Sequence, residues 1–324
     1  MGRGHAMSRY ARQMMLPEVG AVGQARLSTA RVLVVGAGGL AAPVLPLLAG
    51  AGIGHITLID GDVVSLSNLH RQTLFQETDC GRPKAEVAAQ RCSALNSEIE
   101  IVAVAHALTP ANAPLVLADV DLVLDCADSY AVSYLLSDLC HAQKTPLISA
   151  SVLGSGGYVG GFCGGAPSLR AVFPDAPDNS ASCETAGVYG PVVGMIGALQ
   201  AQMALNILLE HVPSPLGQMV QLDCRSYRST TFRFDHAPEP EVSFPFVAIE
   251  ELQADDHIIE LRADAPLLHP KARRSDAEML LQTLPNPQKR LVLCCATGLR
   301  AWRTAERIHP IWPGEIVLVA ASAS

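Results

Sequence analysis

Residues Arg31–Gly39 read RVLVVGAGG, a short apolar run that ends in glycines. Such a run is typical of a buried parallel strand that enters a tight turn, and Leu40–Ala51 is expected to continue as a helix. Gly36, Gly38 and Ala41 fit the pattern G-x-G-x-x-A, with Gly39 inside it. Glycines let the backbone approach a phosphate, and a helix amino terminus favours negative charge. The stretch predicts a nucleotide-binding turn. The alternative is a strand–helix turn without a ligand.

An acidic residue follows where a ribose would need it. Asp60 ends the next predicted strand, His55–Asp60, and lies 24 positions after Gly36. A carboxylate at this place can accept hydrogen bonds from ribose hydroxyls. Taken alone, the turn and Asp60 are equally typical of nicotinamide or flavin binding.

The segment after Asp60 favours ATP. Its candidate cofactor-binding residues are Asp62, Asn68, Arg71, Gln72 and Lys84. A triphosphate carries about four negative charges that cations must neutralise in the transition state, whereas a dehydrogenase needs no such group after its ribose acid. Taken singly, Arg71 and Lys84 are typical solvated surface charges. Behind a glycine turn they predict a triphosphate site.

Strands and helices alternate along the first part of the chain. Further strands are expected at Ile99–Val104, Asp121–Cys126 and Leu147–Ser151, and helices at Pro83–Leu95 and Ser129–Ala142. This order predicts an α/β fold with a doubly wound, mostly parallel sheet of Rossmann-like type. Beyond it we expect hairpin strands in Gly154–Phe173, a polar loop at Pro174–Ser182, one helix or a helix pair in Gly187–Glu210, and antiparallel strands in Gln218–Phe234.

A second, smaller α/β unit is expected after a proline-rich linker. Residues 235–245 read DHAPEPEVSFP and show no apolar periodicity. We therefore predict a first domain at 7–236, a linker at 237–245 and a second domain at 246–324. In the second domain, strands are expected at Ile258–Leu261, Arg290–Cys294 and Ile316–Ala320, and helices at Asp276–Thr283 and Thr297–His309.

Composition limits the function classes. Of 324 residues, 49% are hydrophobic and 17% charged, which is a globular composition, and the net charge of −8 argues against nucleic-acid binding. Glycines, prolines and His55 interrupt the apolar stretch Val32–Ile59, so no membrane span is expected, and Met1–Tyr10 does not read as a secretory leader. Nine scattered cysteines suit a reducing cytoplasm, and no pair has metal-ligand spacing.

In combination and order, a series of motifs resembles the MoeB/ThiF family of ubiquitin-activating-enzyme-like adenylyltransferases from about Arg9 to Phe234. The matching stretches are Arg9–Gln13, Gly36–Leu40, Asp60-x-Asp62, Ser67–Gln72, Gly81–Lys84, Asp125–Ser129, Cys183–Val188 and Gly197–Ala201.

The resemblance implies a role for each matching residue. Asp60 would hold the ribose, and Asn68, Arg71 and Lys84 the phosphates. Asp128 would bind Mg²⁺, a hard cation that prefers oxygen ligands. Arg12 would reach across a homodimer interface to the γ-phosphate of the partner's ATP. The implied substrate is the C-terminal glycine carboxylate of a ubiquitin-like sulfur-carrier protein ending in Gly-Gly.

The sequence departs from the family where many members bind zinc through two Cys-x-x-Cys pairs. Ser168 and Ala171 stand at the first pair and residues 237–240 (APEP) at the second, so no structural zinc is expected. Ala41, Ala127 and Ser129 are smaller departures, at places where Gly, Thr and Asn are common.

Cys183 follows the polar loop and precedes a predicted helix. A helix amino terminus lowers the pKa of a thiol, and in this family a cysteine here can link covalently to the carrier. The alternative is a small buried residue.

Cys295 lies in a run, Leu291–Arg300, that resembles a rhodanese active-site loop: a strand, then Cys-x-x-Gly-x-Arg, then a helix. Successive N–H groups in such a loop would stabilise a thiolate or persulfide. Glu260 replaces the aspartate of the family's usual Asp-x-Arg. A degenerate, purely structural rhodanese-like unit is the alternative.

These features predict an enzyme that adenylates a sulfur carrier with ATP and then transfers sulfur to give a thiocarboxylate. The sulfur donor would be a cysteine desulfurase or thiosulfate. Alternatives are adenylation of a peptide or small acid, a non-catalytic dimeric scaffold, and a nicotinamide oxidoreductase.

Overall fold

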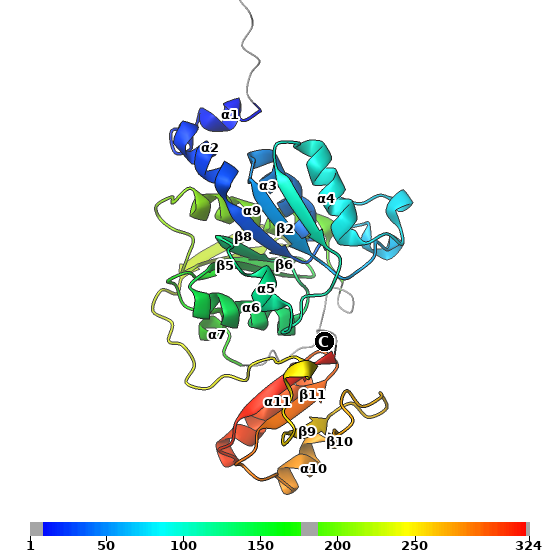
Figure 1. The fold of residues 1–324 in the computed structure, drawn as a ribbon. Helices are drawn as coiled ribbons and strands as arrows, with labels where there is room; N and C mark the ends of the chain where they lie inside the picture. The colour runs from blue at the N-terminus through cyan, green and yellow to red at the C-terminus, as the bar shows by residue number, and fades with distance from the viewer. Residues whose placement is uncertain (1–8, 176–186, 322–324) are drawn as a thin grey trace, which may run out of the picture.

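The structure, a computed structural model, describes residues 9–175 and 187–321. Its main sheet has eight strands in the order β3-β2-β1-β4-β5-β6-β7-β8 (Figure 1). The first five are parallel: β1 (Arg31–Val35), β2 (His55–Ile59), β3 (Glu100–Val104), β4 (Leu122–Asp125) and β5 (Pro146–Leu153). The last three continue it antiparallel: β6 (Gly156–Cys163), β7 (Gln218–Asp223) and β8 (Arg228–Arg233). The predicted doubly wound sheet is confirmed.

Helices cover both faces of this sheet, and β1 shows why its sequence is apolar throughout. Val32 and Val34 face one core, shared with α3 (Ala41–Ala51), α4 (Lys84–Leu95) and α9 (Gly190–Leu208). Leu33 and Val35 face the other, shared with α5 (Ala113–Val116), α6 (Tyr130–Gln143) and α7 (Leu169–Val172). Two short helices, α1 (Ala11–Met14) and α2 (Gly20–Thr29), precede β1. A strand buried on both faces reads as a continuous apolar run rather than an alternating one.

One local prediction needs correction. The stretch Gly154–Phe173 was expected to be hairpin strands throughout, but only β6 is a strand and Leu169–Val172 is the helix α7. Ser168 caps α7, because its hydroxyl accepts a hydrogen bond from the Ala171 N–H at 3.2 Å. Of the two forms expected for Gly187–Glu210, the structure has the single helix α9, Gly190–Leu208. By length and composition α9 could cross a membrane, but 44% of its most apolar window is buried and it packs on α3, β5 and β6, as a core helix does.

The second unit is a four-stranded parallel sheet in the order β10-β9-β11-β12. Its elements are β9 (His257–Glu260), β10 (Arg273–Arg274), α10 (Ala277–Gln282), β11 (Leu291–Cys295), α11 (Leu299–Ile308) and β12 (Ile316–Ala320). The two-residue strand β10 was not predicted, because two exposed arginines carry no strand pattern. Figure 1 shows this orange-to-red unit beside the α6 and α7 end of the large domain.

The segment between the two sheets is anchored rather than free. The Glu239 carboxylate accepts hydrogen bonds from Ser168, through its N–H at 2.8 Å and through its hydroxyl. Further along, Leu318 N–H donates to the Pro245 carbonyl and Val247 N–H to the Leu318 carbonyl, so residues 245–247 run along β12. The predicted linker at 237–245 thus contains no helix or strand, yet it is tied to both units.

Candidate functional site

The glycine turn lies where the strand order reverses. β1 lies between β2 and β4, so the loops after β1 and β4 meet at a topological switch point, the usual ligand crevice of open α/β sheets. Gly36 has φ +91°, and a Cβ there would lie 2.7 Å from the Cys126 carbonyl oxygen. Only glycine allows both the backbone angle and the close approach.

Beyond Gly36 the chain presents unpaired donors. In the part of the chain that the structure describes, the amides of Gly38, Gly39 and Leu40 have no backbone acceptor. They sit at the amino end of α3, where free N–H groups and the helix dipole favour an anion. Gly39 also gives room to its neighbours, since a Cβ there would lie 2.8 Å from Val193 on α9 and 3.5 Å from Cγ of Arg71.

Gln72 closes over this turn. Its amide nitrogen would lie 3.7 Å from a Cβ on Gly38, and the side chain is only 3% exposed. Its carbonyl oxygen is buried without a hydrogen-bond partner among the described residues. A buried unpaired oxygen costs stability, and together with the free amides of the turn it makes Gln72 a candidate for a ligand contact.

Asp60 holds the turn in shape. One carboxylate oxygen accepts a hydrogen bond from Ala37 N–H at 2.6 Å and the other from Asp62 N–H at 2.7 Å. Burial raises the pKa of Asp60, while these two amides act in the opposite direction. Both oxygens keep lone-pair capacity, so the predicted ribose contact is compatible with this structural role.

Lys84 and Asp62 form the charged side of the site. Lys84 opens α4 and is 4% exposed, and its Nζ donates to Asp62 at 2.8 Å. The Asp62 side chain is 74% exposed. The ammonium has two further donors, so it can bind a phosphate without leaving Asp62.

Asn68 and Arg71 lie beside the glycine turn, on the segment that follows Asp60 and Asp62. Asn68 ends the short helix η1 (Leu66–Asn68), and its backbone carbonyl accepts hydrogen bonds from the amides of Arg71 and Gln72. The stem of Arg71 lies against Gly39, and its guanidinium lies 3.0 Å from the His70 ring. Both predicted phosphate contacts therefore stand beside the turn.

Asp128 lies in the loop between β4 and α6. Its side chain is exposed and makes no hydrogen bond or ion pair with another described residue. Sequence reasoning missed the role of its neighbour Asp125, the fully buried last residue of β4. Asp125 accepts hydrogen bonds from Ser149 at 2.8 Å and from Ala127 N–H at 3.1 Å, and burial raises its pKa to about 6. The sequence did contain a signal for Asp125, because an acidic residue at the end of an apolar strand is expected to be buried and hydrogen-bonded.

Arg12 lies away from the glycine turn of its own chain. It lies on α1, next to Tyr10, whose ring covers Gly52 at the far end of α3. The 11 residues of α3 separate that end from the glycine turn by about 16 Å. The expected contact of Arg12 with the γ-phosphate in a partner subunit stays a prediction.

Of the two candidate cysteines, only Cys295 lies among the residues that the structure describes. Cys183 lies outside the described residues. Cys295 is the last residue of β11, 2% exposed, and its Sγ accepts a hydrogen bond from Ala301 N–H at 3.4 Å in the first turn of α11. Glu260 forms a two-pronged pair with Arg262, at 2.7 and 2.8 Å, so glutamate fills the place of the family's aspartate.

Several known proteins share these features. An adenylyltransferase and sulfurtransferase named uba4 from Aspergillus fumigatus is 37% identical over 317 residues, covering 94% of this chain and 59% of that protein. The sulfur carrier protein ThiS adenylyltransferase of Escherichia coli is 40% identical over 234 residues, covering 69% of this chain and 91% of that protein. The chain spans about half the length of other curated relatives that it matches.

The fold recurs in a solved structure. The microcin C7 biosynthetic enzyme MccB in complex with N-formylated MccA has a TM-score of 0.64 and 25% identity, with 72% of this chain and 74% of that chain covered. The ThiF family profile matches residues 10–243, which include the glycine turn, Asp60, Lys84 and Asp128. With this sheet order and this arrangement at the switch point, the chain belongs to the ThiF family.

Proposed function

We propose that the protein adenylates the C-terminal glycine carboxylate of a ubiquitin-like sulfur-carrier protein with ATP and then transfers sulfur to it. The observation that carries the proposal is the meeting of free amides, buried Lys84, unpaired Gln72 and exposed Asp128 at one switch point. The names of the ThiS adenylyltransferase and of the sulfurtransferase relatives support the substrate class.

In the first step a carboxylate oxygen of the carrier attacks the α-phosphorus of ATP. An acyl–adenylate forms, and pyrophosphate leaves with the electron pair of the broken P–O bond. The turn amides, Lys84, Arg71 and Asn68 are placed to stabilise the phosphate charge, and Arg12 of a partner subunit would add a cation. Mg²⁺ held by the Asp128 carboxylate would offset the remaining phosphate charge, because this hard cation prefers oxygen ligands. We propose a homodimer because Arg12 would act on the ATP of the partner subunit.

In the second step sulfur replaces AMP. The Cys295 thiolate would take the outer sulfur of thiosulfate and release sulfite, or receive sulfur from a cysteine desulfurase. The resulting persulfide attacks the acyl–adenylate and expels AMP, giving an acyl disulfide. A second thiolate, for which Cys183 is the candidate, then attacks Sγ of Cys295 and frees the thiocarboxylate. The enzyme disulfide left behind requires an external thiol reductant.

All cysteines in the described ranges are free thiols, which suits the cytoplasm that we propose as the compartment.

We also propose that no structural zinc is bound. The two segments that would supply its thiolates meet directly, because Glu239 accepts two hydrogen bonds from Ser168. A carboxylate already paired with an N–H and a hydroxyl offers no tetrahedral site by itself.

ATP–pyrophosphate exchange tests the first step. We expect exchange with a purified carrier ending in Gly-Gly and none with the same carrier lacking its last glycine. Asp128→Ala should lower exchange at least 100-fold, whereas Asp121→Asn, at the opposite end of β4, should leave it within about twofold. Exchange that needs no carrier, or that survives Asp128→Ala, would refute the assignment. Exchange only with short peptides would show that the substrate is a peptide and not a carrier protein.

Gln72→Leu should lower the affinity for ATP without lowering the free energy of unfolding. It removes an unpaired buried oxygen, so the free energy of unfolding should stay equal or rise by about 1 kcal/mol, while ATP affinity by calorimetry falls about tenfold. Gln24 is a matched control, since it is also buried but satisfied by Gln13 and the Ala51 carbonyl. Gln24→Leu should destabilise by about 1–3 kcal/mol without changing affinity. The reverse pattern would mean that Gln72 does not face the nucleotide.

Cys295→Ala should abolish persulfide formation with thiosulfate, measured by mass spectrometry, and leave exchange intact. Cys294→Ala is the neighbouring control. Cys294 is fully buried and burial raises its pKa to about 12, so it should contribute no persulfide. Persulfide retained in Cys295→Ala would exclude Cys295 as the acceptor.

Metal analysis of the purified protein should find less than 0.1 zinc per chain, and chelators should leave the melting temperature unchanged. Glu239→Gln should lower the free energy of unfolding by about 1 kcal/mol, because a charge-assisted pair of hydrogen bonds is lost. Exposed Glu241→Gln is the control and should be neutral. Stoichiometric zinc would contradict the proposal.

A further inference from the structure

Arg170 stands at the contact between the two units of the chain. Its guanidinium donates to both oxygens of Asp138, at 2.6 and 2.9 Å, and to the Phe244 carbonyl at 3.3 Å. The same group lies 4.8 Å from the centre of the Tyr134 ring and 5.1 Å from that of Trp302. We call these five residues the Arg170 joint: it connects α6 and α7 of the first unit, the linker and α11 of the second unit.

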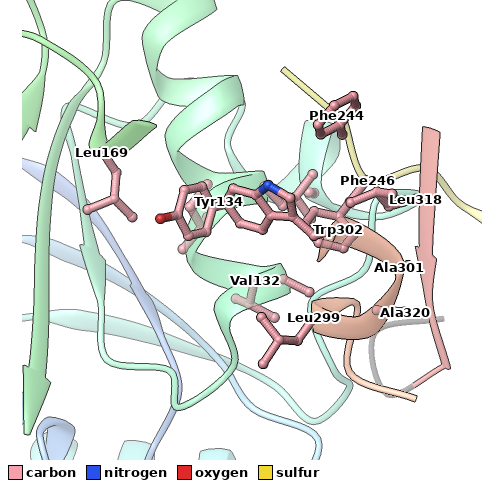
Figure 2. Close-up of a cluster of buried hydrophobic side chains, with 14 of the residues drawn as sticks. Val132, Tyr134, Leu169, Phe244, Phe246, Leu299, Ala301, Trp302, Leu318 and Ala320 are labelled. Atoms are coloured by element: carbon pink, nitrogen blue, oxygen red, sulfur yellow. The ribbon is translucent and has the colours of Figure 1, made fainter. Parts of the chain in front are cut away.

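The joint is built as a fixed contact. Tyr134 and Trp302 meet edge to face, with ring centroids 4.3 Å apart at 87° (Figure 2). Trp302 is 2% and Arg170 4% exposed, and both units contribute to one continuous hydrophobic cluster. Contacts between domains of one chain are ordinarily more polar and allow relative motion. A buried guanidinium between two rings, satisfied by a carboxylate, is strongly orienting because its planar geometry tolerates little displacement.

The joint also orients the Cys295 loop. Figure 2 shows Leu299 pointing toward Val132 on the first turn of α6, within the same cluster. Leu299 follows Cys295 by four residues, and Val132 follows Asp128 by four residues. Each four-residue step spans at most roughly 14 Å, so with the Leu299–Val132 contact between them Cys295 lies within roughly 40 Å of Asp128. The Asp128 loop and the Cys295 loop, which would carry the two half-reactions, are therefore connected through one packed contact between the two units.

We propose that the Arg170 joint keeps the second domain docked during sulfur transfer, so that the persulfide on Cys295 attacks the acyl–adenylate held by the same chain. Arg170 and Trp302 are positioning residues for this transfer and touch neither substrate. The inference rests on the proposed function, since it concerns how its two half-reactions are joined. The bond changes are those given above: the outer sulfur of the persulfide is acylated, and AMP leaves with the electron pair of the broken C–O bond.

The first test uses Arg170→Ala in the full-length chain. Exchange and persulfide formation, measured separately, should each stay within about twofold of the unaltered protein. Thiocarboxylate formation from carrier, ATP, thiosulfate and dithiothreitol should fall at least tenfold. Trp302→Phe, which keeps a ring at the joint, should retain more of this coupled rate than Trp302→Ala. Arg307→Ala is the matched control, because it breaks only an exposed pair with Glu278 within the second unit.

The second test needs no change at the joint. Asp128→Ala and Cys295→Ser chains, each lacking one half-reaction, are mixed in equal amounts. Transfer within one chain predicts less than a tenth of the unaltered coupled rate. A mixture that reaches a quarter or more would overturn the inference, as would an undiminished coupled rate in Arg170→Ala. Absence of both half-reactions in the unaltered protein would instead refute the proposed function.

Discussion

The close approach of Gly36 to the end of β4 is the constraint on which the site depends. A Cβ at Gly36 would lie 2.7 Å from a carbonyl oxygen of the neighbouring loop, so a side chain would push β1 and that loop apart. With the backbone this close, the loop carrying Asp128 lies next to the turn, whose amides at residues 38–40 have no backbone acceptor. The missing side chain thereby brings free amides and an exposed carboxylate to the same switch point.

A chain of hydrogen bonds carries this arrangement across the sheet. Ala37 in the turn donates to Asp60, Asp60 also accepts from the Asp62 amide, and the Asp62 carboxylate accepts from Lys84. The turn, the end of β2 and the start of α4 are thus held together before any nucleotide arrives. Groups fixed in this way need little reorganisation when charge develops on a phosphate, which is the condition for strong electrostatic stabilisation. The same arrangement explains why Asp60 tolerates burial that raises its pKa.

The fold and the place of the glycine turn could be predicted because they depend on short-range patterns, whereas the roles of the site residues follow from the family resemblance and stay predictions. A continuous apolar run followed by glycines predicts a parallel strand and its turn, and the carboxyl ends of parallel strands meet at one edge, which brings Asp60 and Asp128 near Gly36. The pairing of Lys84 with Asp62, the unpaired oxygen of Gln72 and the burial of Asp125 depend on partners that no periodicity reveals. Helix α7 was missed for a related reason: it is four residues long, and its cap and contacts, not its composition, hold it in place.

Helix α7 and its cap residue hold the linker through hydrogen bonds. Within three positions, Ser168 binds Glu239 and Arg170 binds the Phe244 carbonyl, so the linker is fixed at two points. Each bond is weaker than a metal–thiolate bond, but the second also engages Asp138, Tyr134 and Trp302, so its loss would disturb packing as well as one hydrogen bond. Fixing the linker at two points limits where the second unit can lie. Positioning of the second unit and anchoring of the linker are therefore two consequences of the same few side chains.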